Sequence, residues 1–325
     1  MLIIYKIYKK TKHLNKTCYS SRISGWFLMK RKVIQIADST QLVSLPRKWA
    51  QQYNIKKGDE IEIAEEGNTL RISTGKGLDV EKAVINIKNP SHFMRRSISS
   101  LYKLGYDEIE VDFEDAKVID LIQKELDELL GFEIVNQTEG SCILKNIAPG
   151  LDTEFDSILR RIFLMNLSMA KDSYDSVVKG DLERLDDIMK LESTNNKLTN
   201  FCERMLNKKG YKDYKRVNII YLIIVNLERI ADEFRDLCDY IHKNQEMKIS
   251  KDTLAVYKGC VELFDLFYQL FYNYDLEKMF KMKEKRIELE TRAFGLITKK
   301  KDDTVTLHYM IAIIQLIHHM TEGLS

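Results

Sequence analysis

The hydrophobic positions follow two different periods along the chain. Up to residue 149, short runs of β-branched residues alternate with polar ones and are separated by Gly, Asn and Asp, which is typical of strands joined by turns. From residue 150 on, apolar residues recur at helical spacing, and the last of the three prolines is Pro149. Proline inside a helix costs about 3 kcal/mol. The pattern therefore predicts a β-rich first part and an all-helical second part, with the main boundary at Ala148-Pro149-Gly150.

The first part divides into two predicted domains. Residues 29–75 predict a small β module with strands at 31–36 and 42–45, a turn at 38–40, a helix from Pro46 to about Asn54, and a hairpin of 60–63 with 69–72. Residues 76–149 predict an α+β domain with strands at 83–87, 108–113, 132–135 and 141–144 and helices at 90–104 and 115–130. The order βαβαββ indicates a small sheet with helices on one face.

The second part predicts six helices, at 152–178, 181–208, 213–245, 250–273, 275–299 and 303–322. Asp181 and Asp275 each stand where a helix N-cap is expected, and they are followed by the similar runs Leu-Glu-Arg-Leu and Leu-Glu-Lys-Met. This repetition indicates a duplicated three-helix unit, with repeats at 150–246 and 247–325.

Charge changes this picture only at the N-terminal end. Lys and Arg number 51 against 49 Asp and Glu, so no bulk field drives nucleic-acid binding. Residues 1–28 nevertheless contain six basic side chains and no acidic one. Their apolar run, 2–5, is too short for a signal peptide. We expect a disordered tail or a translation start at Met29, with a basic arm that touches phosphates as the alternative.

The sequence carries none of the common catalytic signatures. It has no G-x-S-x-G, Walker A, H-E-x-x-H or G-x-G-x-x-G motif, and we expect no enzymatic activity. The five cysteines are scattered without clustered spacing, which indicates reduced thiols in a cytoplasmic protein. No apolar run approaches the about 20 residues that a membrane-spanning helix needs, so we expect no membrane insertion.

Basic side chains gather in the predicted β module. Arg31 and Lys32 open its first strand, and Arg47 and Lys48 enter its helix beside Ser44. Cations in the first turn of a helix oppose its dipole, and a nearby anion such as a DNA phosphate would remove that cost.

The run Ser-Leu-Pro-Arg-Lys-Trp at 44–49, followed by Lys-Gly-Asp at 57–59, resembles the AbrB/SpoVT class of DNA-binding domains. Gln41 stands where many members of that class have glycine before the second strand. The resemblance implies a swapped-hairpin homodimer whose basic residues face DNA, here Arg31, Lys32, Ser44, Arg47 and Lys48. A module used only for dimerisation is the alternative.

Carboxylates continue an apolar ridge on the third predicted helix. Ile220, Ile224, Glu228, Asp232 and Asp236 follow one another at i, i+4 spacing. Like charges at that spacing repel one another, and a hard divalent or iron cation would relieve the repulsion. A solvated face is the alternative.

The run Asn-Leu-Glu-Arg-Ile-Ala-Asp at 226–232 closely resembles a motif of the PhoU family, and 159–165 with Ser168-Met169 resemble its archaeal members. PhoU proteins are six-helix duplicated bundles that regulate phosphate uptake, and some bind metal through acid-x-x-x-acid pairs. The resemblance implies a first metal site at Glu192, Asn196, Glu228 and Asp232. A second, weaker set comprises Glu284, Glu288, Gln315 and His319, in which Gln and His replace acids. Zinc at His318 and His319 is disfavoured.

The order of an AbrB-like module, an α+β domain and a PhoU-like bundle looks like archaeal regulators of that family. It implies a phosphate-responsive transcriptional regulator that binds DNA as a homodimer and senses metal or phosphate. It also implies docking on a phosphate ABC transporter or its sensor kinase. The alternative is an adaptor that does not bind DNA. A ferritin-like di-iron enzyme is disfavoured because the chain has no Glu-x-x-His pairs.

Overall fold

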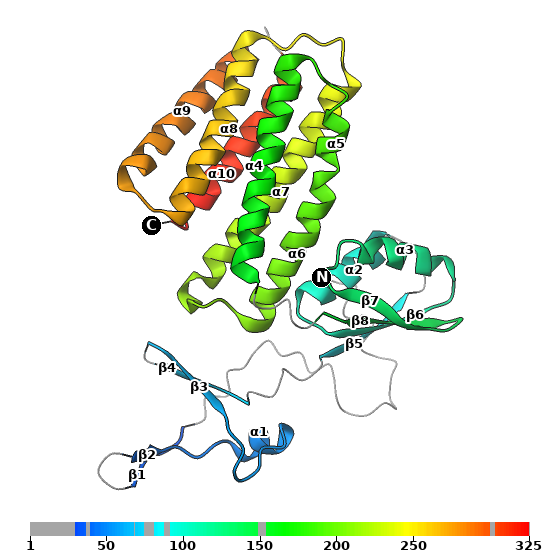
Figure 1. The fold of residues 1–325 in the computed structure, drawn as a ribbon, viewed down its shortest axis with the longest axis vertical. Coiled ribbons are helices and arrows are strands. Elements are labelled where there is room, and N and C mark those ends of the chain that lie inside the picture. The colour runs from blue at the N-terminus through cyan, green and yellow to red at the C-terminus, as the bar shows by residue number, and fades with distance from the viewer. Residues whose placement is uncertain are drawn as a thin grey trace. The chain divides into compact units, whose positions relative to one another are not determined.

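The computed structural model describes residues 30–36, 40–67, 69–74, 81–87, 92–148, 154–299 and 303–324 (Figure 1). The sequence predictions for residues 1–28 and for the turn at 38–39 lie outside these residues. The chain divides into two compact units, Met1–Gly77 and Leu78–Ser325. The main division therefore falls after Gly77 rather than at Ala148-Pro149-Gly150, because the α+β domain packs onto the helical bundle.

The first unit consists of two hairpins and a short helix. Strands β1 (Ile34–Ile36) and β2 (Thr40–Leu42) pair antiparallel, helix α1 (Arg47–Gln52) follows, and β3 (Glu62–Glu66) pairs antiparallel with β4 (Thr69–Ser73). Gly58, in the turn before β3, has a φ of 94°. Glycine adopts this conformation readily because it has no Cβ. The prediction of a strand over 42–45 is wrong. The register pairs Leu42 with Ile34, where β1 begins, so residues 43–45 pair with no strand among the residues that the structure describes.

The α+β domain of the second unit has the predicted βαβαββ order. Its elements are β5 (Lys82–Ile87), α2 (His92–Lys103), β6 (Glu108–Phe113), α3 (Lys117–Leu126), β7 (Phe132–Gln137) and β8 (Ser141–Asn146). The sheet order is β5-β6-β8-β7, with β5 parallel to β6 and the other pairs antiparallel. Alternate residues such as Ile109, Val111 and Phe113 are buried against α2 and α3, so both helices cover one face. Helix α3 ends at Leu126, before the predicted 130, because the following residues form tighter i, i+3 turns.

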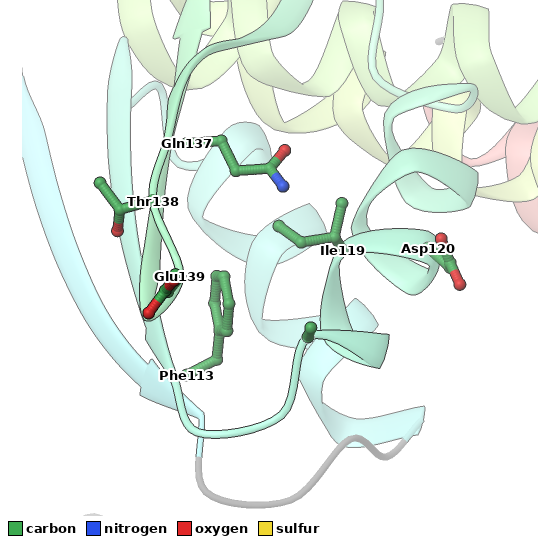
Figure 2. A pocket seen from close by; sticks show the side chains of 7 residues that line it. Phe113, Ile119, Asp120, Gln137, Thr138 and Glu139 are labelled. Carbon is green, nitrogen blue, oxygen red and sulfur yellow. The ribbon is translucent and has the colours of Figure 1, made fainter.

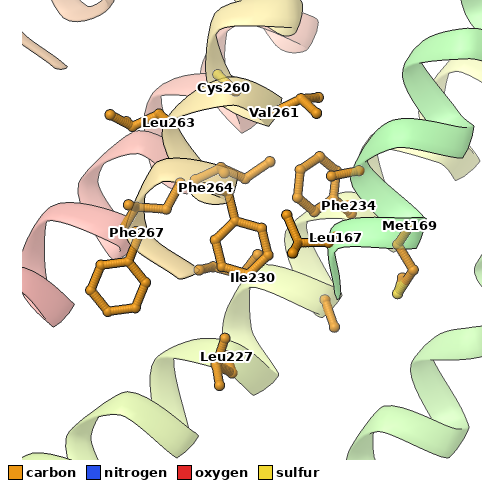
Figure 3. Close-up of a cluster of buried hydrophobic side chains, with 14 of the residues drawn as sticks. Leu167, Met169, Leu227, Ile230, Phe234, Cys260, Val261, Leu263, Phe264 and Phe267 are labelled. Atoms are coloured by element: carbon orange, nitrogen blue, oxygen red, sulfur yellow. The ribbon is translucent and has the colours of Figure 1, made fainter. Parts of the chain in front are cut away.

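The described part of the bundle contains the six predicted helices, with the second one divided in two. They are α4 (Phe155–Lys179), α5 (Leu185–Met189), α6 (Leu191–Lys209), α7 (Val217–Lys243), α8 (Lys251–Tyr272), α9 (Leu276–Thr298) and α10 (Thr304–Thr321). Helices α4 to α7 pack together as one repeat, and α8 to α10 as the other. The repeats join through α7 with α10 and α4 with α8, around a continuous apolar core that includes Leu227, Ile230, Phe234 and Phe264 (Figure 3).

The two repeats differ at the start of their second helix. Asp275 caps α9 as predicted, since its side chain accepts a hydrogen bond from the Lys278 amide at 2.8 Å. The same prediction for Asp181 is wrong. Gly180 ends α4 with a φ of 73°, and the Asp181 amide donates back to the Ser176 carbonyl at 2.9 Å. Asp181 therefore belongs to the end of α4, and the predicted helix over 181–208 is divided into α5 and α6.

Helices α8 and α9 approach closely at Gly259. A Cβ there would lie 2.2 Å from Leu289 Cδ2, and Leu289 is buried. Overpacking of this kind costs about 1–3 kcal/mol, so we expect Gly259→Ala to lower the free energy of unfolding by that amount in urea denaturation. The double variant with Leu289→Ala should lose less than the sum of the two single losses, because the shortened side chain leaves room for the added Cβ. Gly295→Ala is the control, because a Cβ at that position meets open space. Equal stability of the Gly259→Ala and Gly295→Ala variants would contradict this packing.

Candidate DNA-binding surface and carboxylate cluster

The five residues predicted to face DNA all lie in the first unit. Arg31 and Lys32 precede β1, Ser44 lies between β2 and α1, and Arg47 and Lys48 form the first turn of α1. Each of these side chains is exposed. The first turn of α1 contains no acidic residue. Exposed cations without neighbouring carboxylates in their helix can neutralise phosphates.

Apolar side chains of the same unit are also exposed. Among its described residues none is buried, and the large apolar side chains of the two hairpins are 38–65% exposed. Ile34 and Ile36 lie on β1, and Ile63, Leu70 and Ile72 lie on the second hairpin. A segment that buries so little apolar surface lacks the main stabilising term of folding. The described part of this unit therefore leaves the apolar side chains of both hairpins exposed.

The first predicted carboxylate set surrounds an arginine. The Arg235 guanidinium lies 2.8 Å from Glu192 Oε1, 3.0 Å from Asp232 Oδ1 and 2.9 Å from Asp236 Oδ1. Asn196 donates to Glu192 Oε1 at 2.6 Å, while its own Oδ1 has no hydrogen-bond partner. The structure therefore brings Glu192, Asn196 and Asp232 together, with a positive charge of the chain between the carboxylates.

Burial acts on the remaining acids of this region. It raises the pKa of Glu228, and the neighbouring Glu203 and Glu192 charges add to the rise. Burial also raises the pKa of Glu128, which belongs to the α+β domain. The negative charges of Glu125, Glu192 and Glu228 raise it further. The cluster thus includes a carboxylate from the α+β domain that the sequence analysis did not identify.

Asp232 makes the stability of the protein depend on pH. Burial, the Glu228 charge and a hydrogen bond with Glu192 raise its pKa from the ordinary 3.8 to about 7, against the opposing effect of Arg235. Between these values the folded state binds more protons than the unfolded state, so stability falls as pH rises from about 4 to about 7. We expect Asp232→Asn to make the fall of Tm across this range shallower. Asp239→Asn, an exposed acid of α7 paired with Lys243, is the control. Retention of the wild-type slope in both variants would contradict this assignment.

The second predicted set is not brought together. Glu284 and Glu288 on α9 and Gln315 and His319 on α10 are exposed, and among the described residues no hydrogen bond or ion pair joins the two pairs. The α9 charges that act on His318 of α10 are Arg286 and Glu290. Successive residues of a helix are turned by about 100°. Glu284 and Glu288 therefore project from a different side of α9 than Arg286 and Glu290, which face α10.

Helix α6 holds the α+β domain through a buried arginine. Arg204 is 1% exposed and donates to the carbonyls of Tyr102 and Tyr106 at 2.8 and 2.6 Å, and to Asp107 Oδ1 at 2.7 Å. Its guanidinium lies over the rings of Tyr102 and Phe132. Asp107 also pairs with Lys208, and nearby Lys103 of α2 pairs with Glu203 at 3.0 Å. This contact joins the sheet domain to the bundle.

Sequence reasoning missed both arginines. Arg235 stands three residues after Asp232 on one helix, and this i, i+3 spacing could have indicated the ion pair. Arg204 has no local signal, because its partners lie 97 to 102 residues away in the sequence.

A groove of about 620 Å³ lies between α3 and the turn that joins β7 to β8 (Figure 2). Phe113 and Ile119 line its floor, while Asp120 and Glu139 lie on opposite sides of it. Polar groups in a ligand site converge on one point, and these do not.

Two family models match the chain. Residues 34–77 match the model described as antidote-toxin recognition MazE, bacterial antitoxin. Residues 159–241 match the model of the PhoU domain. These matches confirm, at the level of domains, the resemblance of the N-terminal module to MazE/AbrB-like domains and that of the bundle to PhoU. They also support the predicted order of a small strand module, an α+β domain and a helical bundle.

Similarity to whole proteins is weaker. A solved structure of the phosphate transport system regulatory protein PhoU from Streptococcus pneumoniae is 14% identical, with 53% of this chain and 89% of that chain covered and a TM-score of 0.38. No curated protein matches the chain. Among the described residues, no helix combines the length and the apolar character that crossing a bilayer requires.

Proposed function

We propose that this chain, which joins a MazE-type antitoxin domain to a PhoU domain, is a DNA-binding regulator of phosphate uptake. The observation that carries the proposal is the first unit, where exposed cations accompany two hairpins with uncovered apolar faces. A homodimer would cover those faces and place two copies of Arg31, Lys32, Arg47 and Lys48 on one assembly. That gives eight exposed cations on one assembly, in a module whose 29–75 segment carries eight basic and six acidic residues per copy.

The bundle would supply the signal. A PhoU domain in the same chain supports a role in phosphate homeostasis, exerted through sensing of phosphate or through contact with a phosphate ABC transporter or its sensor kinase. The Arg204 contact supports a coupling between the bundle and the α+β domain, since it joins α6 to α2 and to the turn before β6 within one compact unit.

The proposal is tested by a fluorescence-anisotropy titration with DNA from the protein's own upstream region. Each phosphate neutralised by a basic side chain releases counterions, so the logarithm of the binding constant should fall by about 0.9 per neutralised phosphate for each tenfold rise in salt. We expect the logarithm of the binding constant to fall with the logarithm of the salt concentration with a slope of about −5 or steeper. Unrelated DNA should compete for the protein less well than the upstream sequence does. Absence of binding at low salt would refute DNA recognition.

An adaptor that regulates the transporter or its kinase without touching DNA is the second candidate. The same uncovered hairpin faces favour it, because dimerisation alone would account for them. Both candidate functions predict a dimer, but only the DNA-binding regulator predicts binding in the anisotropy titration. A protein that is dimeric by light scattering but does not bind DNA would support the adaptor.

The residues of the first carboxylate set, as placed, do not fit a metal ion. The Arg235 guanidinium takes the position that a cation between Glu192 and Asp232 would need. The described part of the chain also contains no group of three or more His, Cys, Asp or Glu side chains suited to a metal. A hard divalent or iron ion at Glu192, Glu228 and Asp232 stays a prediction from the sequence that requires Arg235 to move away. Elemental analysis of protein purified without chelators tests it.

A further inference from the structure

Helix α9 presents an apolar face that no described part of the chain covers. Leu276, Phe280, Ile287 and Phe294 are 46–60% exposed. Seven residues span nearly two helical turns, so Phe280, Ile287 and Phe294 form one stripe along the helix. The core-facing side of α9 is separate and carries Met282, Leu289, Ala293 and Leu296. We call Leu276, Phe280, Ile287 and Phe294 the α9 stripe.

The stripe opens at one end into a groove. This groove of about 220 Å³ is lined by Tyr274, Leu276, Met279 and Phe280, with the basic side chains of Lys283 and Arg286 beside them. Apolar side chains exposed in a row along one helix, next to an apolar groove, mark an interaction site on a protein.

The equivalent helix of the first repeat is a docking surface. Helix α6 takes in the first repeat the place that α9 takes in the second, and α6 is contacted by α2 of the α+β domain. The α6 side chains that hydrogen-bond to the α+β domain include Asn200, Glu203, Arg204 and Asn207. The α9 stripe is apolar instead, so its occupant must offer an apolar face.

Charge along α9 identifies the occupant. Residues 276–286 carry five basic and two acidic side chains, whereas 287–298 carry two acidic side chains and one basic. An antiparallel second copy sets the basic end of one helix against the acidic end of the other. A twofold axis at Ile287 then places Phe280 against Phe294 of the second copy, and Lys283 near Glu290 of the second copy. Parallel packing would instead place Lys283 beside its own counterpart.

We propose that two copies of the chain pack antiparallel through the α9 stripe, about a twofold axis at Ile287. The contact is isologous, because the same patch serves both copies. It is separate from the dimer of the N-terminal module, and it stands whether or not that module binds DNA.

Cysteine cross-linking of the full chain tests the proposal. A twofold axis brings the residue on it against itself, and a disulfide needs two Cβ atoms about 4 Å apart. The four cysteines that the structure describes are buried, and Cys18 is replaced by Ser in the background chain. Under mild oxidation we expect Ile287→Cys to form covalent dimers about tenfold faster than Lys281→Cys, because only the former meets its own copy at that spacing.

Lys281→Cys is the matched control, since it is exposed on another side of α9 and reports collisions in any dimer held elsewhere. A mixture of Phe280→Cys and Phe294→Cys chains should link faster than either chain alone. Linkage of Ile287→Cys no faster than Lys281→Cys would overturn the proposal, and so would faster linkage of Phe280→Cys with itself. Slow linkage of Ile287→Cys would mean that a different protein covers the stripe. Fast linkage of Phe280→Cys with itself would mean that the two copies pack in parallel.

Discussion

Replacing Arg204 by Ala is expected to lower the free energy of unfolding by about 3–5 kcal/mol, because it removes one of the two cations paired with the buried Asp107 carboxylate and the donor to two carbonyls. Asp107 is 8% exposed and would keep only Lys208, and the carbonyls of Tyr102 and Tyr106 would lose their donor. The removed guanidinium also leaves space against the rings of Tyr102 and Phe132. The stability of Arg204→Lys should lie between those of wild type and Arg204→Ala. An ammonium keeps the charge but cannot bond the carbonyls and the carboxylate at the same time, as the guanidinium does.

Urea denaturation measures the loss, and hydrogen exchange locates it. We expect amides of α2 and β5 to β8 to exchange faster in Arg204→Ala, while those of α8 and α10 keep their protection. Lys212→Ala is the control, since Lys212 pairs with Asp156 at 2.7 Å with both side chains largely exposed. Such pairs contribute about 0–1 kcal/mol. If Arg204→Ala were as stable as Lys212→Ala, the junction would not depend on this contact.

Local pattern was sufficient for most elements of the fold. Alternation in Glu-Ile-Glu-Val-Asp-Phe at 108–113 predicts β6, and the 3.6-residue apolar spacing after Pro149 predicts the helices. The errors arise where the role of a residue depends on the element next to it rather than on its own propensity. Asp181 has the chemistry of an N-cap but completes the end of α4. Residues 43–45 have strand propensity but pair with no strand that the structure describes.

The sites depend more on tertiary contacts and were predicted less well. The i, i+4 ridge on α7 grouped Glu228 with Asp232, and the resemblance to the PhoU family added Glu192; in the structure the charge of Glu192 acts on both of these acids. The ridge did not reveal Arg235 as the cation between them, because a charged residue on the polar side of a helix has the pattern of a solvated one. Glu128 comes from another domain, so no periodicity within α7 indicates it. For the second set, spacing alone does not fix which sides of α9 and α10 face each other.

The second large effect concerns DNA. We expect the variant with Ala at Arg31, Lys32, Arg47 and Lys48 to bind upstream DNA at least about a hundredfold more weakly at 150 mM salt, because up to eight basic side chains of a dimer no longer reach phosphates or bases. A control variant with Ala at Lys179, Lys190, Lys212 and Lys243 has the same change in net charge, removed from exposed positions of the second unit. It should bind nearly as well as wild type. The comparison therefore separates a local surface from bulk charge.

Single substitutions separate the roles within that surface. If Lys48 contacts a phosphate, Lys48→Ala should weaken binding about equally on all sequences and reduce the salt slope by about one unit for each phosphate that is no longer neutralised. Arg47 can make a forked contact with a guanine edge, worth about 1–3 kcal/mol of discrimination, so Arg47→Ala should lose preference for the upstream site more than general affinity. Light scattering and a melting curve must first show that each variant is folded and has the wild-type mass. If the fourfold variant then binds upstream DNA as tightly as wild type, the exposed cations of the first unit do not contact DNA, and the uncovered hairpin faces serve dimerisation alone.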